Sequence, residues 1–163
     1  MTRDCMKRQQ PFGVCLIREG AEVGKPATPA AIGCLAAITD WDMQQLGMLH
    51  LQTRGAQRFQ ILKSDANAQG LLSADVELVP PEDAVAVPEA FQGCVKLLER
   101  VVGDRGAAVF NEPHRMDDAV WVGYRLAEIL PIPLPAKQKL LELDDSLARL
   151  SLLHKFLEMN GLL

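Results

Sequence analysis

The sequence predicts an α+β fold, in which a β-rich N-terminal part is followed by an all-helical C-terminal part. Before residue 80 apolar side chains alternate with polar ones, which is the period of half-buried strands. After residue 88 they recur every three or four residues, which is the period of amphipathic helices. Between the two patterns lies the proline-rich stretch Pro80–Pro88, which we interpret as a linker. We therefore expect a strand subdomain over residues 1–80 and a helical subdomain over residues 88–163.

The stretch Leu49–Leu62 organises the strand part, because its apolar residues alternate on both sides of Gly55. A glycine inside a strand typically marks a bulge, a corner or a close backbone approach. One long strand bent at Gly55 and two strands sharing that corner both fit the pattern. Such a corner lets a small sheet fold over itself into a barrel-like unit. We expect Gly55 to adopt a positive φ or to touch a neighbouring backbone.

The other N-terminal elements follow from aliphatic runs, alternation, and Gly and Pro breaks. Pro11 ends the first element, and the last strand alternates Leu72, Ala74, Val76 and Leu78 with polar residues, which predicts one buried and one exposed face. In chain order we expect a helix over residues 2–10, a strand over 12–18, a loop over 19–31, a strand over 32–39, a turn over 40–47, the Gly55 strand, a turn over 64–70 and a strand over 71–79.

Four helices are predicted in the C-terminal part from apolar stripes bounded by breakers. The acid pairs Asp117-Asp118 and Asp144-Asp145 resemble catalytic carboxylate pairs, but each precedes a predicted helix, so we interpret them as N-caps. The expected helices span residues 88–104, 117–130 and 136–143, followed by a last helix that ends at Gly161.

Composition excludes several classes of protein. With 163 residues, 48% of them hydrophobic and 23% charged, the chain is expected to be soluble, globular and large enough for a sizeable core. No apolar run reaches the roughly 20 residues of a membrane span, and the polar start does not resemble a signal peptide. The four cysteines never form a CxxC pair, so we expect reduced cysteines in a cytoplasmic protein without a metal site.

The charge distribution argues against nucleic acid as a partner. Residues 1–63 hold eight Lys and Arg against five Asp and Glu, whereas residues 64–163 hold nine against sixteen. A strongly basic patch is therefore absent, although nucleic-acid binding depends on one. We interpret the acidic half as solvated helix faces.

No catalytic residues can be assembled from the sequence. The stretch Gly20–Pro26 is one residue short of a phosphate loop, and Pro26 replaces the Ser or Thr that would hold Mg²⁺. The histidines stand alone, and no activating base accompanies Ser64, Ser73, Ser146 or Ser151. We therefore expect no enzyme activity, no cofactor and no metal.

The candidate binding residues are an apolar cluster and two arginines. Trp41, Met43, Leu46 and Met48 lie around the predicted turn, and Met-rich surfaces suit varied partners. The alternative is that these side chains fold back onto the core. Arg54 and Arg58 flank Gly55 on the expected outer face. They would bind either an acidic peptide or the acidic helical half, and we favour the contact within the chain.

Several segments match one family in order and spacing, over nearly the whole chain. They are Phe12-Gly13-Val14 with Ile17, the Glu19-Gly20 loop, Ile32-Gly33-Cys34-Leu35-Ala36, Arg54-Gly55 with Arg58-Phe59, Ala74-Asp75-Val76-Glu77, the run from Lys137 to Leu143, and Arg149-Leu150. In these segments the chain resembles the N-terminal domain of Lon proteases, and more closely the stand-alone bacterial Lon-domain proteins.

The resemblance implies a PUA-like β pseudobarrel followed by a C-terminal helical bundle, and a role in recognising protein substrates. Two departures stand out. The two opening strands of the family pattern are missing, so we expect an unpaired strand edge that favours self-association. The ATPase and protease domains of the full enzyme are missing as well.

The leading hypothesis is a non-catalytic module that binds unfolded or extended protein segments. The binding surface would be a groove between the sheet and the helical part, or a strand edge that accepts a peptide by β-augmentation. The alternatives are an oligomerisation module without a client of its own, and a peptidase-associated protein of the Lon type.

Overall fold

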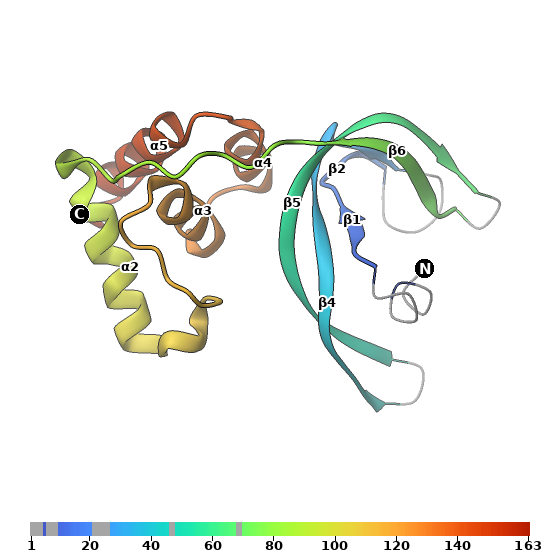
Figure 1. Ribbon diagram of the computed structural model, residues 1–163, viewed down its shortest axis with the longest axis horizontal. Helices are drawn as coiled ribbons and strands as arrows, with labels where there is room; N and C mark the ends of the chain where they lie inside the picture. The colour runs from blue at the N-terminus through green and yellow to red at the C-terminus, as the bar shows by residue number, and fades with distance from the viewer. Residues whose placement is uncertain (1–4, 6–9, 21–26, 46–47, 68–69) are drawn as a thin grey trace. The chain divides into compact units, whose positions relative to one another are not determined.

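The structure is a computed structural model that describes residues 5, 10–20, 27–45, 48–67 and 70–163 (Figure 1). The chain divides into two compact units, Met1–Pro81 and Glu82–Leu163. The helix expected over residues 2–10 falls almost entirely outside the described residues.

The N-terminal unit is built from antiparallel strands. One sheet has the order β1-β4-β5-β6, and β2 pairs with β3 in a second sheet. The strands are β1 (Phe12–Val14), β2 (Ile17–Glu19), β3 (Thr28–Pro29), β4 (Ile32–Gln45), β5 (Met48–Ala66) and β6 (Leu72–Leu78). The single strand expected over residues 12–18 is wrong, because β1 and β2 pair in different sheets. The loop expected over residues 19–31 contains β3, the partner of β2.

Strands β4 and β5 form a long curved ribbon (Figure 1). Their pairing runs from Ile32 opposite Gln60 to Gln45 opposite Met48. The turns expected over residues 40–47 and 64–70 are therefore largely wrong, because β4 continues through Gln45 and β5 through Ala66. Pairing to a neighbouring strand overrides the polar composition at both places.

Gly55 lies inside one continuous strand, and a bulge adjoins it. Cys34 pairs with Arg58 and Ala36 with Gly55, so β5 carries one more residue than β4 over this interval. The expected positive φ or close contact at Gly55 is wrong. Its φ is not positive, and a Cβ added there would meet only the Cys34 Sγ, at 3.7 Å.

The close approaches in this unit lie at Gly13 and Gly33, which pack against the ring of Phe59. A Cβ on Gly13 would lie 2.9 Å from the Phe59 Cζ, and one on Gly33 would lie 2.6 Å from the same atom. Phe59 is only 3% exposed, and the other buried hydrophobic residues described here are Ala30 and Ala36. The described residues of the strand unit therefore form only a small core.

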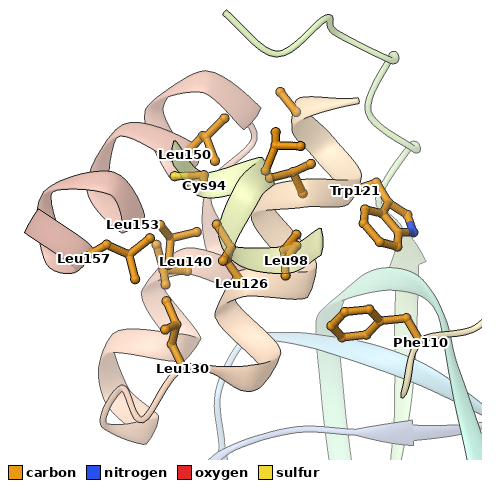
Figure 2. Packing of buried hydrophobic residues seen from close by; sticks show 13 residues of the cluster. Cys94, Leu98, Phe110, Trp121, Leu126, Leu130, Leu140, Leu150, Leu153 and Leu157 are labelled. Atoms are coloured by element: carbon orange, nitrogen blue, oxygen red, sulfur yellow. The ribbon is translucent and has the colours of Figure 1, made fainter. Parts of the chain in front are cut away.

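The C-terminal unit consists of helices around one hydrophobic core (Figure 2). The α-helices are α2 (Gln92–Arg105), α3 (Ala119–Ile129), α4 (Leu134–Glu142) and α5 (Ser146–Met159), with short 3₁₀ turns η1 (Glu89–Phe91) and η2 (Ala107–Val109). The predicted stripes supply this core, as Cys94 and Leu98 on α2 and Leu153 and Leu157 on α5 show. Phe110 and Trp121 add an edge-to-face ring pair with centroids 5.7 Å apart.

The N-cap interpretation of the acid pairs is confirmed for Asp118 and Asp145. The Asp118 carboxylate accepts a hydrogen bond from the backbone N–H of Val120 at 3.0 Å. The Asp145 carboxylate accepts from the N–H groups of Leu147 and Ala148, both at 2.9 Å. These carboxylates satisfy amides that have no partner within the helix.

The start of the C-terminal unit is extended and bonded to helix α3. The Val87 N–H donates to the Asp117 carbonyl at 3.0 Å, and the Ala119 N–H donates to the Val85 carbonyl at 2.7 Å. The Asp118 carboxylate also accepts from the Val85 N–H at 3.4 Å. The first residues of this unit are therefore held against their own helices.

Candidate protein-binding surface

The far end of the β4–β5 ribbon is a two-stranded arm. Strand β1 pairs with β4 only over residues 34–36, and β6 pairs with β5 only over residues 59–66. Within the described chain, residues 37–45 and 48–54 therefore pair only with each other, and we call these residues the ribbon arm. Figure 1 shows it running past β1 toward the end of the hairpin. Two strands alone bury little apolar surface.

The predicted apolar cluster lies on this ribbon arm. Trp41 is 53% exposed, Met43 50% and Met48 52%, while Leu46 lies outside the described residues. The alternative in which these side chains fold back onto a core is wrong for the three that are described. The cluster belongs to two paired strands and not to a turn, because the ladder reaches Gln45 and Met48.

Two carboxylates bond to the backbone beside the cluster. The Asp40 carboxylate accepts from the Trp41 N–H at 2.8 Å, and the Asp42 carboxylate accepts from the Met43 N–H at 2.7 Å. The register shifts on both sides of this stretch interrupt the regular ladder. The carboxylates therefore add local side-chain to backbone hydrogen bonds in a stretch where the strand pairing is irregular.

The two arginines point to opposite faces of the sheet. Ala37 pairs with Arg54 and Cys34 with Arg58, and positions 34 and 37 of β4 face opposite ways. Arg54 is exposed, but Arg58 is only 9% exposed. The outward placement expected for Arg58 is wrong, because the bulge beyond Gly55 reverses the facing of β5. Both expected partners of Arg54, an acidic peptide and the favoured acidic helical half, stay predictions.

A second exposed apolar surface, missed by the sequence reasoning, lies on β6. The side chains of Leu72, Ala74, Val76 and Leu78 share one face of this strand, which we call the β6 apolar face. Leu72 is 37% exposed, Val76 39% and Leu78 47%. The burial expected for this face is wrong, because alternation marks two faces but does not show whether anything covers one. Pro80 and Pro81 mark the end of the strand but carry no signal of whether one of its faces is covered.

The described residues do not assemble a catalytic constellation. Among them, no serine hydroxyl is hydrogen-bonded to a histidine or lysine, and no group of three or more His, Cys, Asp or Glu is placed to hold a metal. Most of the stretch Gly20–Pro26 lies outside the described residues. No described helix is long and apolar enough to cross a membrane.

The cysteines are free thiols, and two of them are held protonated by their surroundings. Burial raises the pKa of the Cys94 thiol to about 11, and the negative charge of Glu158 adds to this effect. Burial also raises the pKa of the Cys15 thiol. A thiol of raised pKa is a weak nucleophile at neutral pH, so neither group resembles a reactive cysteine.

These observations define an α+β protein that exposes apolar strand surfaces. A family model for the substrate-binding domain of the ATP-dependent protease La (LON) matches residues 1–159. The chain belongs to this Lon substrate-binding domain family, and it carries the mixed strand and helix fold of Lon N-terminal domains.

Two solved structures are similar to the chain. A Lon N-terminal domain protein from Xanthomonas campestris is 32% identical with a TM-score of 0.76, over 94% of this chain and 80% of that one. The N-terminal domain of a Mycobacterium avium complex Lon protease is 19% identical with a TM-score of 0.55, over 86% of this chain and 74% of that one. The second likeness supports the fold alone. A search of curated proteins finds no match.

Proposed function

We propose that the chain is a non-catalytic module that binds unfolded or extended protein segments, and that the ribbon arm makes the contact. The main evidence is that Trp41, Met43 and Met48 are half exposed and lie on an arm that the other described strands do not cover. Trp supplies a large contact area, and Met adapts its shape to different side chains. Membership of a substrate-binding family supports a protein client.

The balance of burial in the strand unit supports the same proposal. Its described part fully buries three hydrophobic side chains but leaves nine large ones exposed. Exposed apolar surface in a folded protein commonly marks an interaction site. Clients bound here would cover surface that the unit does not bury by itself.

The finer architecture and the setting also remain proposals. We propose that the strand unit closes as a PUA-like pseudobarrel, which the register shifts in β4 and β5 support because bulges bend strands. We propose that the helices form a bundle, with the segment expected as a linker over residues 80–88 bonded in its later part to the start of α3. Free cysteines support a cytoplasmic setting, and the net charge of −4 argues against nucleic acid.

The test is binding of a permanently unfolded client. Reduced, carboxymethylated α-lactalbumin, fluorescently labelled, is titrated with the protein and followed by anisotropy, with native α-lactalbumin as the folded comparison. The triple variant Trp41→Ser, Met43→Ser, Met48→Ser should bind the unfolded client about tenfold more weakly, because large apolar side chains dominate such contacts.

A matched control removes exposed apolar side chains from the helical unit. Leu134, Leu152 and Met159 are exposed as well, so the triple Ser variant at these positions should keep near-normal affinity. Equal losses in both triple variants would refute the ribbon arm as the contact. Absence of client binding by the unmodified protein would refute the module itself. Light scattering tests the alternative of an oligomerisation module. If that alternative holds, the triple variant of the ribbon arm has a different particle mass from the unmodified protein.

A further inference from the structure

The strand unit holds the chain by hydrogen bonds as far as Val79, one residue beyond the end of β6. The Val79 N–H donates to the Arg58 carbonyl at 2.9 Å. The side-chain amide of Gln57 donates to the Val79 carbonyl, also at 2.9 Å. Both polar groups of the Val79 backbone are therefore bonded within the strand unit, so Val79 does not belong to a free linker.

The helical unit holds the chain again from Glu82. The Glu82 carboxylate accepts hydrogen bonds from the Arg149 guanidinium at 2.8 and 3.0 Å and from the Tyr124 hydroxyl at 2.7 Å. Arg149 is fully buried, so this anchor lies inside the helical unit. The next anchor along the chain is the backbone of Val85, whose carbonyl accepts from the N–H of Ala119 at 2.7 Å.

Only Pro80 and Pro81 lie between these two anchors, and both are exposed. The ring of each proline fixes its own φ and removes the N–H group. A residue that precedes a proline is also confined to extended conformations, which restricts Val79 and Pro80 as well. Proline-rich connectors behave as semi-rigid spacers, whereas glycine-rich ones behave as flexible coils. The connection between the units is therefore both short and stiff.

We propose that Pro80-Pro81 is a stiff joint that limits the rotation of one unit relative to the other, and that the Glu82–Arg149 ion pair sets its length. Without this pair the first anchor of the helical unit is Val85, and the free stretch grows from residues 80–81 to residues 80–84. A stiff joint transmits a reorientation of one unit to the other, which a flexible linker over residues 80–88 does not. The inference depends on bonds within each unit and does not rest on client binding.

The test measures the distribution of distances between the units by double electron–electron resonance. Nitroxide labels are attached to a keto amino acid placed at Gln60 on β5 and at Glu99 on α2, which are exposed, so the free cysteines stay unmodified. Excess unlabelled protein restricts the signal to distances within one chain. The double variant Pro80→Gly, Pro81→Gly should make the distribution about twofold wider, because glycine adopts many more backbone conformations.

Variants of Glu82 test whether the ion pair sets the length of the joint. Glu82→Ala should widen the distribution, because it releases residues 82–84 from the helical unit. Glu82→Gln keeps an oxygen acceptor for Arg149 and should lie between, which keeps the test open if the alanine variant unfolds by circular dichroism. The control Pro133→Gly, Pro135→Gly exchanges two prolines within the helical unit and should keep the width of the unmodified protein.

Several outcomes would overturn the inference. An unmodified protein with a distribution as wide as that of the double glycine variant at residues 80 and 81 has no stiff joint. Equal widening in the control variant would also refute the joint. Widening by the glycines but by neither variant of Glu82 would refute the role of the ion pair. Failure to bind unfolded α-lactalbumin refutes the proposed function and leaves the joint standing.

Discussion

The guanidinium of Arg149 and the carboxylate of Glu82 form a two-point ion pair. Nη1 lies 3.0 Å from Oε2, and Nη2 lies 2.8 Å from Oε1. The Arg149 Nε also donates to the Leu140 carbonyl at 3.0 Å, and the Tyr124 hydroxyl donates to the Glu82 Oε1 at 2.7 Å. The guanidinium carbon lies 4.1 Å from the centre of the Tyr124 ring. The pair ties the first residue of the helical unit to α5 from inside the core.

Breaking this pair should strongly destabilise the helical unit. Arg149 is fully buried, so Arg149→Met leaves the Glu82 carboxylate buried without its cation and should cost about 3–5 kcal/mol. Arg149→Lys keeps the charge but loses the planar fork, so its cost should be smaller. Urea unfolding followed by circular dichroism measures both.

The control for this prediction is Lys139→Met. Lys139 pairs with Glu142 on the surface of α4, at 2.8 Å, with the lysine side chain 81% exposed. Its loss should change stability by no more than about 0.5 kcal/mol, because such exposed helix pairs contribute little. An Arg149→Met variant as stable as Lys139→Met would contradict the structural role of the buried pair.

The helical unit was largely predictable because its signals are local. The stripe with Cys94 and Leu98, and the caps at Asp118 and Asp145, depend on residues within four positions of one another. Gly161 follows the last helix with a φ of +65°, as expected of a C-terminal breaker. The Arg149–Glu82 pair spans 67 positions, and no periodic pattern indicates a partner so far away.

The sequence predicted that the N-terminal unit consists of strands, but it did not predict where the strands end or which way their side chains face. The end of β4 at Gln45 depends on a partner strand, and that partner cannot be read from the local sequence. One bulge residue turns Arg58 to the other face of the sheet, and the alternation of the neighbouring residues does not reveal that bulge. The candidate site was found in part. Trp41, Met43 and Met48 are exposed, but the β6 apolar face was expected to be buried.

An added methyl group should destabilise the protein at Gly33 but have little effect at Gly55. A Cβ on Gly33 would lie 2.5 Å from the Cys15 Sγ and 2.7 Å from the Val14 carbonyl oxygen. Gly33→Ala must therefore shift both the backbone and the Phe59 ring, and it should cost about 1–3 kcal/mol by overpacking. Gly55→Ala should change stability by about 0.5 kcal/mol or less, because the methyl meets only ordinary contacts. Thermal melts that rank the two variants the other way would contradict the packing seen around Phe59.

Asp118 and its neighbour Asp117 provide a matched pair for the helix cap. Asp118→Ala removes the bonds to the N–H groups of Val120 and Val85, so it should cost about 1–2 kcal/mol. Asp118→Asn keeps an oxygen acceptor and should recover most of this loss. Asp117→Ala should cost little, because the exposed Asp117 is bonded through its backbone carbonyl. If denaturant unfolding shows equal losses for Asp117→Ala and Asp118→Ala, Asp118 is not the cap.

Cys94 should make the helical unit less stable in alkaline solution. Burial holds the pKa of its thiol at about 11, above the ordinary value of 9.0. Above pH 9 the unfolded chain therefore releases a proton that the folded chain retains, so unfolding becomes more favourable as the pH rises toward 11. Below pH 9 both states keep the proton, and this contribution to stability is fully present. Urea unfolding at several values between pH 8 and pH 11 measures the effect.

The comparison that isolates this thiol is Cys94→Ala. At pH 8 the variant should be about 1 kcal/mol less stable than the unmodified protein, because a small buried group is lost. The difference should shrink as the pH rises from 9 to 11, because the variant has no proton to release. Val95→Ala removes buried volume from the adjacent position but leaves the thiol in place, so its deficit should stay constant with pH. A constant deficit for Cys94→Ala as well would mean that the thiol ionises equally in the folded and unfolded chains.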